Sequence, residues 1–332
     1  MIIRLSAHQP ADRFYRGGAQ IAAFRGMVSS ATHEPEDWLA SCTTVFGESS
    51  DGLTRLPDGR VLRDAIAADP TWWLGDAHAR RWGDDSQLLV KLLDAGQRLP
   101  VHAHPDDTFA AANLGHTHGK AEGWYILRGG TVHLGLRRDV TMSELVALVE
   151  RQDTDALLSL LHAIDVEPGD AVWVPPGELH AIGEGVLILE LQQPEDLSIL
   201  LEWRGFAIDG AQHGHLGLGF ARALGAVRCS RRTPEELDAL VRRDPSPSTH
   251  RASVFPPEAD AFVRLERHAV AREVVLAPGF AVLVVTRGVL SIAGEEASVG
   301  STFVVPASHG DVEIRPSQGG SGDVLVARPP AP

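Results

Sequence analysis

The chain has 332 residues, 44% of them hydrophobic and 22% charged, which describes an ordinary globular protein long enough for two domains with separate cores. The net charge of −14 argues against binding to nucleic acid or to anionic membrane surfaces. Two cysteines, Cys42 and Cys229, are too few for a disulfide framework. With no secretory signal and no run of about 20 apolar residues, a cytoplasmic location is expected.

Only two of the 30 basic residues are lysines, Lys91 and Lys120, and the rest are arginines. Arginine is bulkier and cannot give up its proton, so a site that needs a compact or titratable ammonium keeps lysine. We therefore expect Lys120 to act in the chemical step and Lys91 in binding of substrate or phosphate. Chance placement in an arginine-rich chain is the alternative.

The first 95 residues mix strand and helix signals. Short strands are expected at residues 21–24 and 38–46, and a short helix at 59–68. Residues 88–93 form an apolar run with one lysine, as expected of a strand whose lysine faces a cavity. The nearby tryptophans are assigned to packing, with a sugar-binding surface as the alternative; they are Trp72, Trp73 and Trp82.

Two stretches carry the chemistry. In residues 96–129, His102 and His104 stand two apart, so on a strand both imidazoles face one way. Glu122 follows Lys120 at the same spacing. In residues 169–180, His180 comes just after a Pro-Pro-Gly turn. Three imidazoles and one carboxylate form a suitable ligand set for a first-row divalent metal.

Helices and strands alternate through the rest of the chain. A Thr-Met-Ser-Glu capping box predicts a helix over residues 141–150, and a second helix is expected over 153–164. Strands should follow at 171–174 and 186–192. Residues 205–228 read as a loop with a short helix at 218–224. A capped helix opens at Thr233, a turn or linker follows at 244–247, and strands resume from Val254.

The two chemical stretches resemble the two cupin motifs. The matching positions are Gly96, His102, His104, Glu122 and Gly129 in the first, and Gly169, Pro175, Gly177 and His180 in the second. The flanks LLVKLLDAGQRLPVHAHPDD, GKAEGWYILRG and VPPGELHAIGEG resemble the class I phosphomannose isomerase family, as do PEDWLAS and LELQQPEDLSILLEW. This resemblance implies a cupin barrel with one divalent metal, zinc foremost, and interconversion of mannose 6-phosphate and fructose 6-phosphate through an enediol.

Residues 274–310 repeat the cupin pattern without its ligands, because Ala281 and Asp311 stand where Glu122 and His180 would be. The expected fold is therefore mainly β, with two jelly-roll barrels and helical insertions. We expect three segments: a metal-binding barrel over residues 1–230 with an insert at about 141–164, a helix and linker over residues 231–250, and a degenerate barrel over residues 251–332.

Candidate site residues go beyond the ligands. Glu190 is expected to be either the general base or a group that orients a metal ligand. The arginine position of the family falls on Gly205, so Arg204, one residue away, becomes a catalytic candidate. A second His-x-His pair, His116 and His118, is assigned to the rim of the substrate pocket, with a solvated loop as the alternative.

Some positions depart from the family pattern. His102 stands where the family usually has glutamine, so manganese, iron, cobalt and nickel join zinc as candidate metals. Pro100 and Gly205 stand where a serine and an arginine are expected near a phosphate. An isomerase of an unphosphorylated or differently substituted sugar is therefore an alternative function. A cupin oxygenase or decarboxylase and a non-catalytic sugar-binding protein are the alternatives from other classes. In each case the partner is a small molecule, and the oligomeric state is not predicted.

Overall fold

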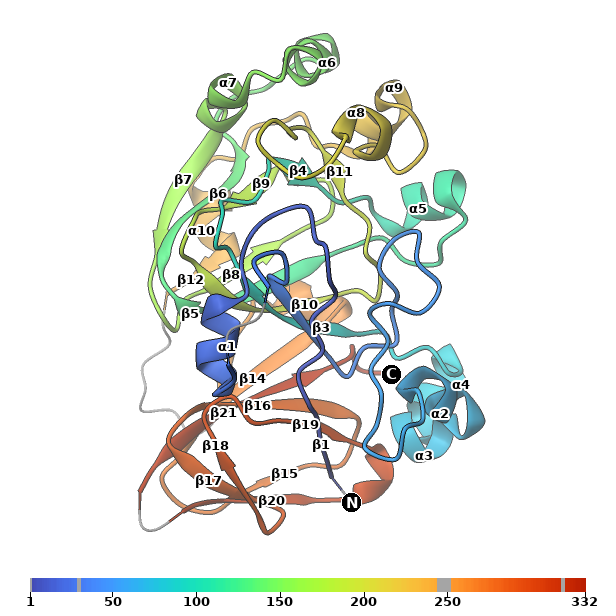
Figure 1. Ribbon diagram of the computed structural model, residues 1–332, viewed down its shortest axis with the longest axis vertical. Helices are drawn as coiled ribbons and strands as arrows, with labels where there is room; N and C mark the ends of the chain where they lie inside the picture. The colour runs from blue at the N-terminus through green and yellow to red at the C-terminus, as the bar shows by residue number, and fades with distance from the viewer. Residues whose placement is uncertain (1, 29–30, 244–251, 318–319) are drawn as a thin grey trace.

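The chain forms a stack of four antiparallel sheets. The structure is a computed structural model that describes residues 2–28, 31–243, 252–317 and 320–332. Two sheets belong to the N-terminal half of the chain and two to the C-terminal half, and the halves lie one above the other (Figure 1). None of the helices in these ranges is long and apolar enough to cross a membrane.

The N-terminal half contains a six-stranded and a five-stranded sheet. The six-stranded sheet has the order β12-β8-β5-β10-β3-β2, with β2 (Glu36–Leu39), β3 (Leu89–Asp94), β5 (Glu122–Arg128), β8 (Ala171–Val174), β10 (Leu187–Gln192) and β12 (Val241–Arg242). The five-stranded sheet has the order β11-β4-β9-β6-β7, with β4 (His102–Ala103), β6 (Gly130–Leu136), β7 (Leu161–Val166), β9 (His180–Ile182) and β11 (Ile199–Leu200).

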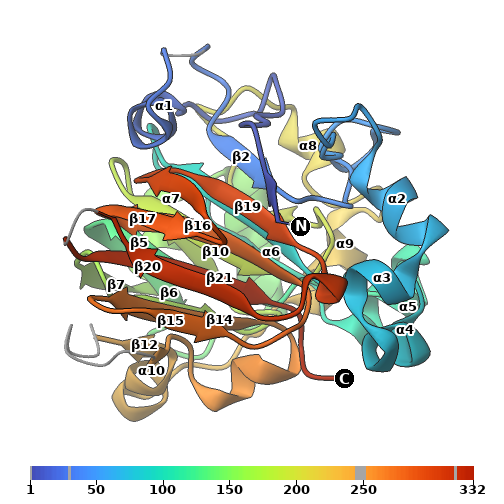
Figure 2. The ribbon, with the colours of Figure 1, turned by 90° about the horizontal axis from the view of Figure 1, so that it is seen from below.

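The C-terminal half also contains two sheets, and its strands lie in front of those of the N-terminal half when the molecule is seen from below (Figure 2). Its six-stranded sheet has the order β1-β19-β16-β21-β14-β13, with β1 (Ile3–Arg4), β13 (Ala252–Ser253), β14 (Arg264–Val270), β16 (Ala281–Arg287), β19 (Thr302–Val305) and β21 (Gly322–Arg328). Its four-stranded sheet has the order β15-β20-β17-β18, with β15 (Val274–Leu276), β17 (Val289–Ile292), β18 (Glu295–Ser298) and β20 (Val312–Pro316).

Short helices cover the edges of the stack. They are α1 (Ala19–Arg25), α2 (Leu62–Ala68), α3 (Pro70–Leu74), α4 (Asp76–Trp82), α5 (Asp107–Leu114), α6 (Met142–Arg151), α7 (Thr154–Ser159), α8 (Gly210–His213), α9 (Phe220–Ala223) and α10 (Pro234–Leu240), with 3-10 turns η1 (Leu224–Ala226), η2 (Pro257–Ala261) and η3 (Ala307–His309). Helices α6 and α7 lie at the end of the molecule farthest from the C-terminal half (Figure 1).

Alternation along the strands explains the layers. In β16, Val282 and Val284 pack in the core shared with the N-terminal half, whereas Leu283 and Val285 pack toward the four-stranded sheet. Successive side chains of a strand point to opposite faces, so a sheet buried on both faces reads as an unbroken apolar run. On the facing sheet, a Cβ at Gly123 would lie 2.6 Å from the ring of Phe255, so only glycine fits there.

Several sequence expectations are confirmed. Strands β3 and β10 lie within one residue of the expected ranges, and helix α2 ends at the expected residue but begins three residues later than expected. Thr141 caps α6 by accepting a hydrogen bond from the N–H of Glu144, and α10 begins with a reciprocal capping box between Thr233 and Glu236.

Other expectations were wrong. Residues 21–24 lie in helix α1 rather than in a strand. The strand expected over 38–46 ends at Leu39, because Ala40 adopts a left-handed conformation with φ of 50°. The helix expected over 153–164 ends at Ser159, and the rest of that range enters β7. The linker expected at 244–247 lies outside the described residues.

The chain exchanges strands across the proposed domain boundaries. Strand β1, from the start of the chain, pairs with β19 in the C-terminal sheet. Strand β12 lies in the proposed connecting segment and pairs with β8, so that segment extends the N-terminal sheet. The division at residues 230 and 250 remains a proposal.

Candidate metal centre and active site

Three histidines from the five-stranded sheet meet between the two N-terminal sheets. His102 in β4 is paired with His180 in β9, and His104 follows two residues later, so all three rings face one side. Their ring centroids lie 4.0 to 5.0 Å apart. One ligand atom from each lies within 4.8 Å of the others, and all three residues are buried. The expected cluster of histidines therefore exists in the structure.

Hydrogen bonds to the backbone fix how these rings face. The Nδ1 atom of His102 lies 2.8 Å from Pro100 O, that of His104 2.6 Å from Leu197 O, and that of His180 2.9 Å from Glu178 O. A carbonyl oxygen only accepts, so each Nδ1 carries the proton. In the neutral rings this leaves the Nε2 lone pairs available as metal ligands.

Glu122 completes the set from the opposite sheet. Its Oε2 lies 3.1 Å from His104 Nε2, and its Oε1 lies 3.2 Å from His180 Nε2. Both nitrogens are buried and make no hydrogen bond, and the buried Oε2 has the Lys120 ammonium at 2.9 Å. Buried acceptors that face each other at such distances fit a shared cation. Because three nitrogens and a carboxylate are the donors that first-row divalent metals prefer, the residues fit a metal ion.

Electrostatics also suits metal binding. Burial, reinforced by the other two histidines, holds the pKa of His102 well below its usual range. Burial and the nearby ammonium of Lys120 lower the pKa of His104 to about 3. Both rings are therefore neutral at ordinary pH. Burial would raise the pKa of Glu122, but Lys120 and His104 outweigh that effect and lower it, so the carboxylate is ionised.

A tight turn brings Lys120 beside the ligands. The backbone N–H of Lys120 donates to Pro105 O, and a Cβ at Gly119 would lie 2.3 Å from that oxygen. The Lys120 Nζ lies 2.9 Å from Glu122 Oε2 and 3.9 Å from Glu190 Oε1. Burial alone would lower the pKa of Lys120, but these two carboxylates raise it. A lysine that acts as a base needs a lowered pKa. The protein groups around Lys120 do not produce one.

Glu190 faces the same space from the neighbouring strand. Cross-strand pairing sets Glu190 of β10 beside Lys91 of β3 on one side and beside Trp124 of β5 on the other. Glu190 Oε1 is buried and makes no hydrogen bond. Burial, reinforced by Glu122 and opposed by the two lysines, raises the pKa of Glu190 to about 7. A carboxyl with such a pKa exchanges a proton readily near neutral pH.

A second charged cluster was not predicted from the sequence. Arg13 donates from Nε to Glu36 at 3.0 Å and from its two terminal nitrogens to Asp196 at 3.2 and 3.3 Å. Glu36 also accepts hydrogen bonds from Tyr15 and Trp38, both at 2.7 Å. Glu36 lies in PEDWLAS and Asp196 in LELQQPEDLSILLEW, so both acidic residues stand in stretches that resemble the phosphomannose isomerase family. Arg13 stands in no motif, and only the fold brings it there.

Lys91 lies within this second cluster. Its Nζ is 3.3 Å from Glu36, 3.7 Å from Asp196 and 3.9 Å from Glu190, and it sits 4.4 Å from the ring centroid of Trp38. The side chain is 2% exposed. Lys91 is thus surrounded by carboxylates, an environment that stabilises the buried charge.

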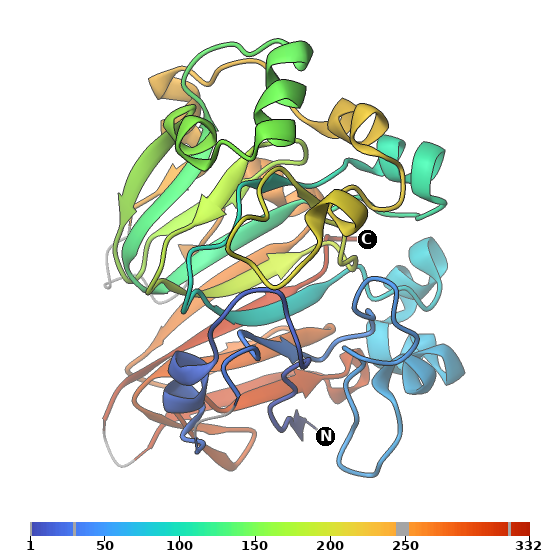
Figure 3. The same ribbon diagram turned by 45° about the horizontal axis from the view of Figure 1, so that its top comes forward.

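Two of the candidate ligands, His102 and Glu122, line a small cavity that adjoins a larger hollow. This small cavity of about 40 Å³ is lined by residues of both clusters, including His102, Lys120 and Glu190. A larger hollow of about 400 Å³, here called the vestibule, shares four lining residues with it: Arg13, Phe14, Asp196 and Ser198. The N-terminal segment and the segment around α8 lie side by side over this region (Figure 3), and Ala207 N–H donates to Phe14 O.

Three candidate residues lie away from these spaces. Arg204 is exposed, and its side chain donates to Arg151 O rather than facing the ligands. His116 contacts Glu195 at 2.8 Å, and His118 contacts Asp85 at 2.6 Å. His118 lines a separate hollow of about 520 Å³. The guanidinium that the fold does bring to the cavity is that of Arg13.

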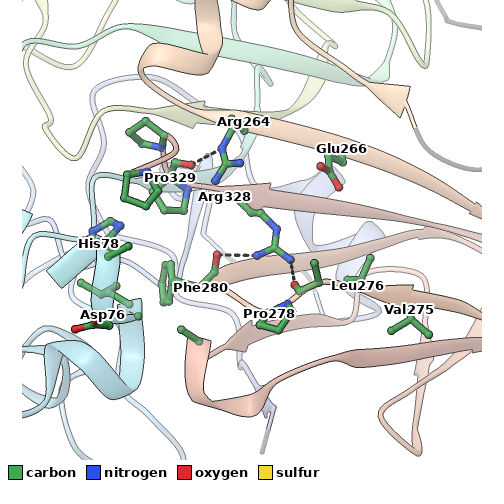
Figure 4. A pocket seen from close by; sticks show the side chains of 18 of the residues that line it. Asp76, His78, Arg264, Glu266, Val275, Leu276, Pro278, Phe280, Arg328 and Pro329 are labelled. Carbon is green, nitrogen blue, oxygen red and sulfur yellow. Dashed lines mark hydrogen bonds between the residues drawn. The ribbon is translucent and has the colours of Figure 1, made fainter. Parts of the chain in front are cut away.

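A further cavity of about 580 Å³ lies between α4 and the C-terminal sheets, and none of the candidate metal ligands lines it (Figure 4). Arg264 donates to Pro329 O, and Arg328 donates to Ala277 O and Phe280 O. These bonds hold the chain end and the loop before β16 in place, so a structural role accounts for them. The C-terminal sheets hold no metal-ligand group among their described residues.

Comparisons with known proteins support the resemblance. No protein-family model matches the chain. Over 122 residues the chain is 40% identical to the mannose-6-phosphate isomerase ManA of Bacillus subtilis. That match covers 36% of this chain and 38% of the relative, so little more than a third of the curated relative is spanned. The expected similarity to phosphomannose isomerases is thus confirmed over this stretch.

The likeness of the fold extends over the whole chain. A mannose 6-phosphate isomerase structure from Bacillus subtilis superposes with a TM-score of 0.67 at 22% identity, covering 98% of this chain and 99% of that one. The apo form of the Salmonella typhimurium mannose 6-phosphate isomerase gives a TM-score of 0.73 at 16% identity, with 99% of both chains covered. The mainly β fold predicted from the motifs is therefore confirmed.

Proposed function

We propose that this protein is a metal-dependent aldose–ketose isomerase that acts on a mannose-type hexose. The observation that carries the proposal is the convergence of the unbonded Nε2 atoms of His104 and His180 on the Glu122 carboxylate, with His102 beside them and Glu190 facing the same cavity. Aldose–ketose isomerisation needs a polarised carbonyl and a base near the carbon-bound proton. The cavity offers groups for both tasks.

The proposed metal ligands are His102, His104, Glu122 and His180. When bound there, a divalent cation would polarise the substrate carbonyl and offset negative charge that develops on its oxygen. Zinc is the proposed ion, and the same donors suit manganese, iron, cobalt and nickel. The Nδ1 hydrogen bonds to the backbone hold the three rings in ligand orientation before any ion binds.

Glu190 is the proposed base that moves the proton between C1 and C2. Its unbonded Oε1 lines the cavity, and its raised pKa gives it both protonation states near neutral pH. Lys120 is proposed to donate hydrogen bonds to the substrate oxygens as charge shifts onto them. The raised pKa of Lys120 keeps it protonated for that task, so it acts as a cationic donor rather than as the base.

Two substrate pairs are candidates. Mannose 6-phosphate and fructose 6-phosphate follow from the name of the curated relative. Free mannose and fructose are favoured by a specific observation, because Pro100 lines the cavity where a phosphate-binding serine was expected and the nearby basic side chains are already paired with carboxylates.

The pH dependence of ketose formation tests the proposal. Glu190 acts as a base only when deprotonated, so kcat/KM should rise with pH and level off above the pKa of Glu190. Since that pKa is raised to about 7, the acid limb should lie well above the range of an ordinary glutamate. The assay compares metal-loaded protein with protein treated with a chelator, which should be inactive. A rate independent of pH between 5 and 8 would argue against Glu190 as the base.

A further inference from the structure

We propose that the substrate carries no charged group at the end away from its reacting carbons, so that the protein isomerises a free hexose in preference to a hexose phosphate. This inference rests on the proposed isomerase function and specifies the substrate class. It follows from the sizes of the small cavity and the adjoining vestibule and from the charged residues that line them.

The sizes show where the far end of the sugar lies. The cavity beside the candidate ligands measures about 40 Å³, against about 400 Å³ for the vestibule, and the two share four lining residues. We therefore place the reacting end of the hexose in the cavity and the rest of the molecule in the vestibule. The vestibule therefore selects the group at the far end.

The basic side chains near this path are already paired. Arg13 bonds Glu36 and both oxygens of Asp196, and Lys120 lies 2.9 Å from Glu122. Lys91 has three carboxylates within 3.9 Å. In the small cavity, Arg13, Lys91 and Lys120 face Glu36, Glu122, Glu190 and Asp196, and the proposed metal ion would add two positive charges there. None of the proposed metal ligands lines the vestibule, where Arg13 and Asp196 are the charged residues.

A phosphate dianion in the vestibule would find no free cation there. Its two negative charges would come close to Asp196, which lines both spaces, while Arg13 is already bonded to Asp196 and Glu36. A charge held without a free partner is unfavourable. Proteins normally hold phosphate with bidentate arginine, lysine or exposed backbone N–H groups at a helix N-terminus. Among the described residues that line the vestibule, Arg13 is the sole arginine or lysine.

The remaining lining suits an uncharged sugar. Ser198, Gln212 and His213 offer hydrogen bonds to hydroxyl groups. Phe14 and Phe46 offer apolar faces, and the Phe46 side chain is exposed. Neutral donors and acceptors can pair with the hydroxyl groups of a sugar, and aromatic rings can cover its C–H faces. No charge is then buried without a partner.

The first experiment compares kcat/KM of the metal-loaded protein for mannose and for mannose 6-phosphate. We expect free mannose to be preferred by at least about tenfold. A tenfold or greater preference for mannose 6-phosphate would overturn the inference while leaving the isomerase proposal intact. If neither sugar is turned over, calorimetric binding of fructose and fructose 6-phosphate decides. Tighter binding of the phosphate overturns the inference, and binding of neither contradicts both proposals.

A pair of variants checks that the vestibule is responsible. Gln212 and Ala211 are neighbouring exposed residues of α8, but only Gln212 lines the vestibule. Gln212→Lys should raise the ratio of kcat/KM for mannose 6-phosphate over mannose by about tenfold, and this gain should shrink at high salt. Ala211→Lys adds the same charge outside the vestibule and should leave the ratio unchanged. Equal effects of the two variants would show that the far end of the sugar lies elsewhere.

Discussion

His180→Ala is expected to strip the metal from the protein and to abolish isomerase activity. His180 is fully buried at the centre of the cluster, and its Nε2 faces Glu122 at 3.2 Å without a hydrogen bond. Removing one of four ligands should weaken metal binding by more than the roughly 10- to 100-fold that loss of a supporting group costs. Metal content after gel filtration and the rate of ketose formation are the measurements.

A matched control separates loss of the metal from loss of the fold. His309 lies in η3 of the C-terminal half, away from the cluster, so His309→Ala should keep metal content and activity. Circular dichroism should show that His180→Ala retains its sheets, and His104→Ala should behave like it. Wild-type metal content in both His104→Ala and His180→Ala would place the metal elsewhere.

Lys120→Arg should lower kcat by about 10²-fold or more, the scale of losing one well-placed donor or proton-transfer group. The Lys120 Nζ lies 2.9 Å from Glu122 in a cavity of about 40 Å³, and its side chain is 6% exposed. A guanidinium keeps the charge, but it is larger and directs its N–H groups differently, so it would not place a donor where the ammonium does. The measurement is kcat at saturating sugar, with metal content determined on the same sample.

Lys120→Met completes this test by removing the charge at a similar side-chain length. If Lys120 stabilises developing charge, both variants lose turnover while keeping metal, and the substitution to methionine loses more. If metal content falls in proportion to activity, Lys120 acts by holding Glu122 in place for metal binding rather than in the reaction itself. A Lys120→Arg protein with unchanged kcat would exclude a role in the chemical step.

The metal cluster was predictable because its residues carry local signals. His102 and His104 are two apart on a strand, and His180 follows a turn whose Gly177 has φ of 81° and donates its N–H to His104 O. Spacing and turn chemistry therefore indicated three of the candidate ligands without tertiary information. Glu122 was found because it follows Lys120 at the spacing of one strand face.

The charged cluster around Arg13 could not be predicted in the same way. Arg13 lies 183 residues from Asp196 in the sequence, and the chain between them gives no sign that they meet. Arg204 was chosen because it is one residue from a family position, but its place in an exposed turn takes it away from the cavity. Contacts of this kind depend on how loops cross the sheets, which local patterns do not determine.

Strand and helix errors have the same origin. Residues 21–24 are apolar enough for a strand, yet they form α1, which packs against the strand β3. Short apolar runs do not distinguish a strand from one buried helical turn, so the surrounding structure decides. The capped helices α6 and α10 were predicted correctly because their N-termini carry explicit hydrogen-bonding residues.

Proton NMR of hexoses incubated in D₂O with protein holding one equivalent of divalent metal tests the central claim most directly. We expect mannose and fructose, or their 6-phosphates, to interconvert to the same mixture from either side, with deuterium entering at C1 or C2. Chelation and Glu190→Gln should each stop the reaction. Fully metal-loaded protein that leaves both free and phosphorylated hexoses unchanged would contradict the assignment as an aldose–ketose isomerase.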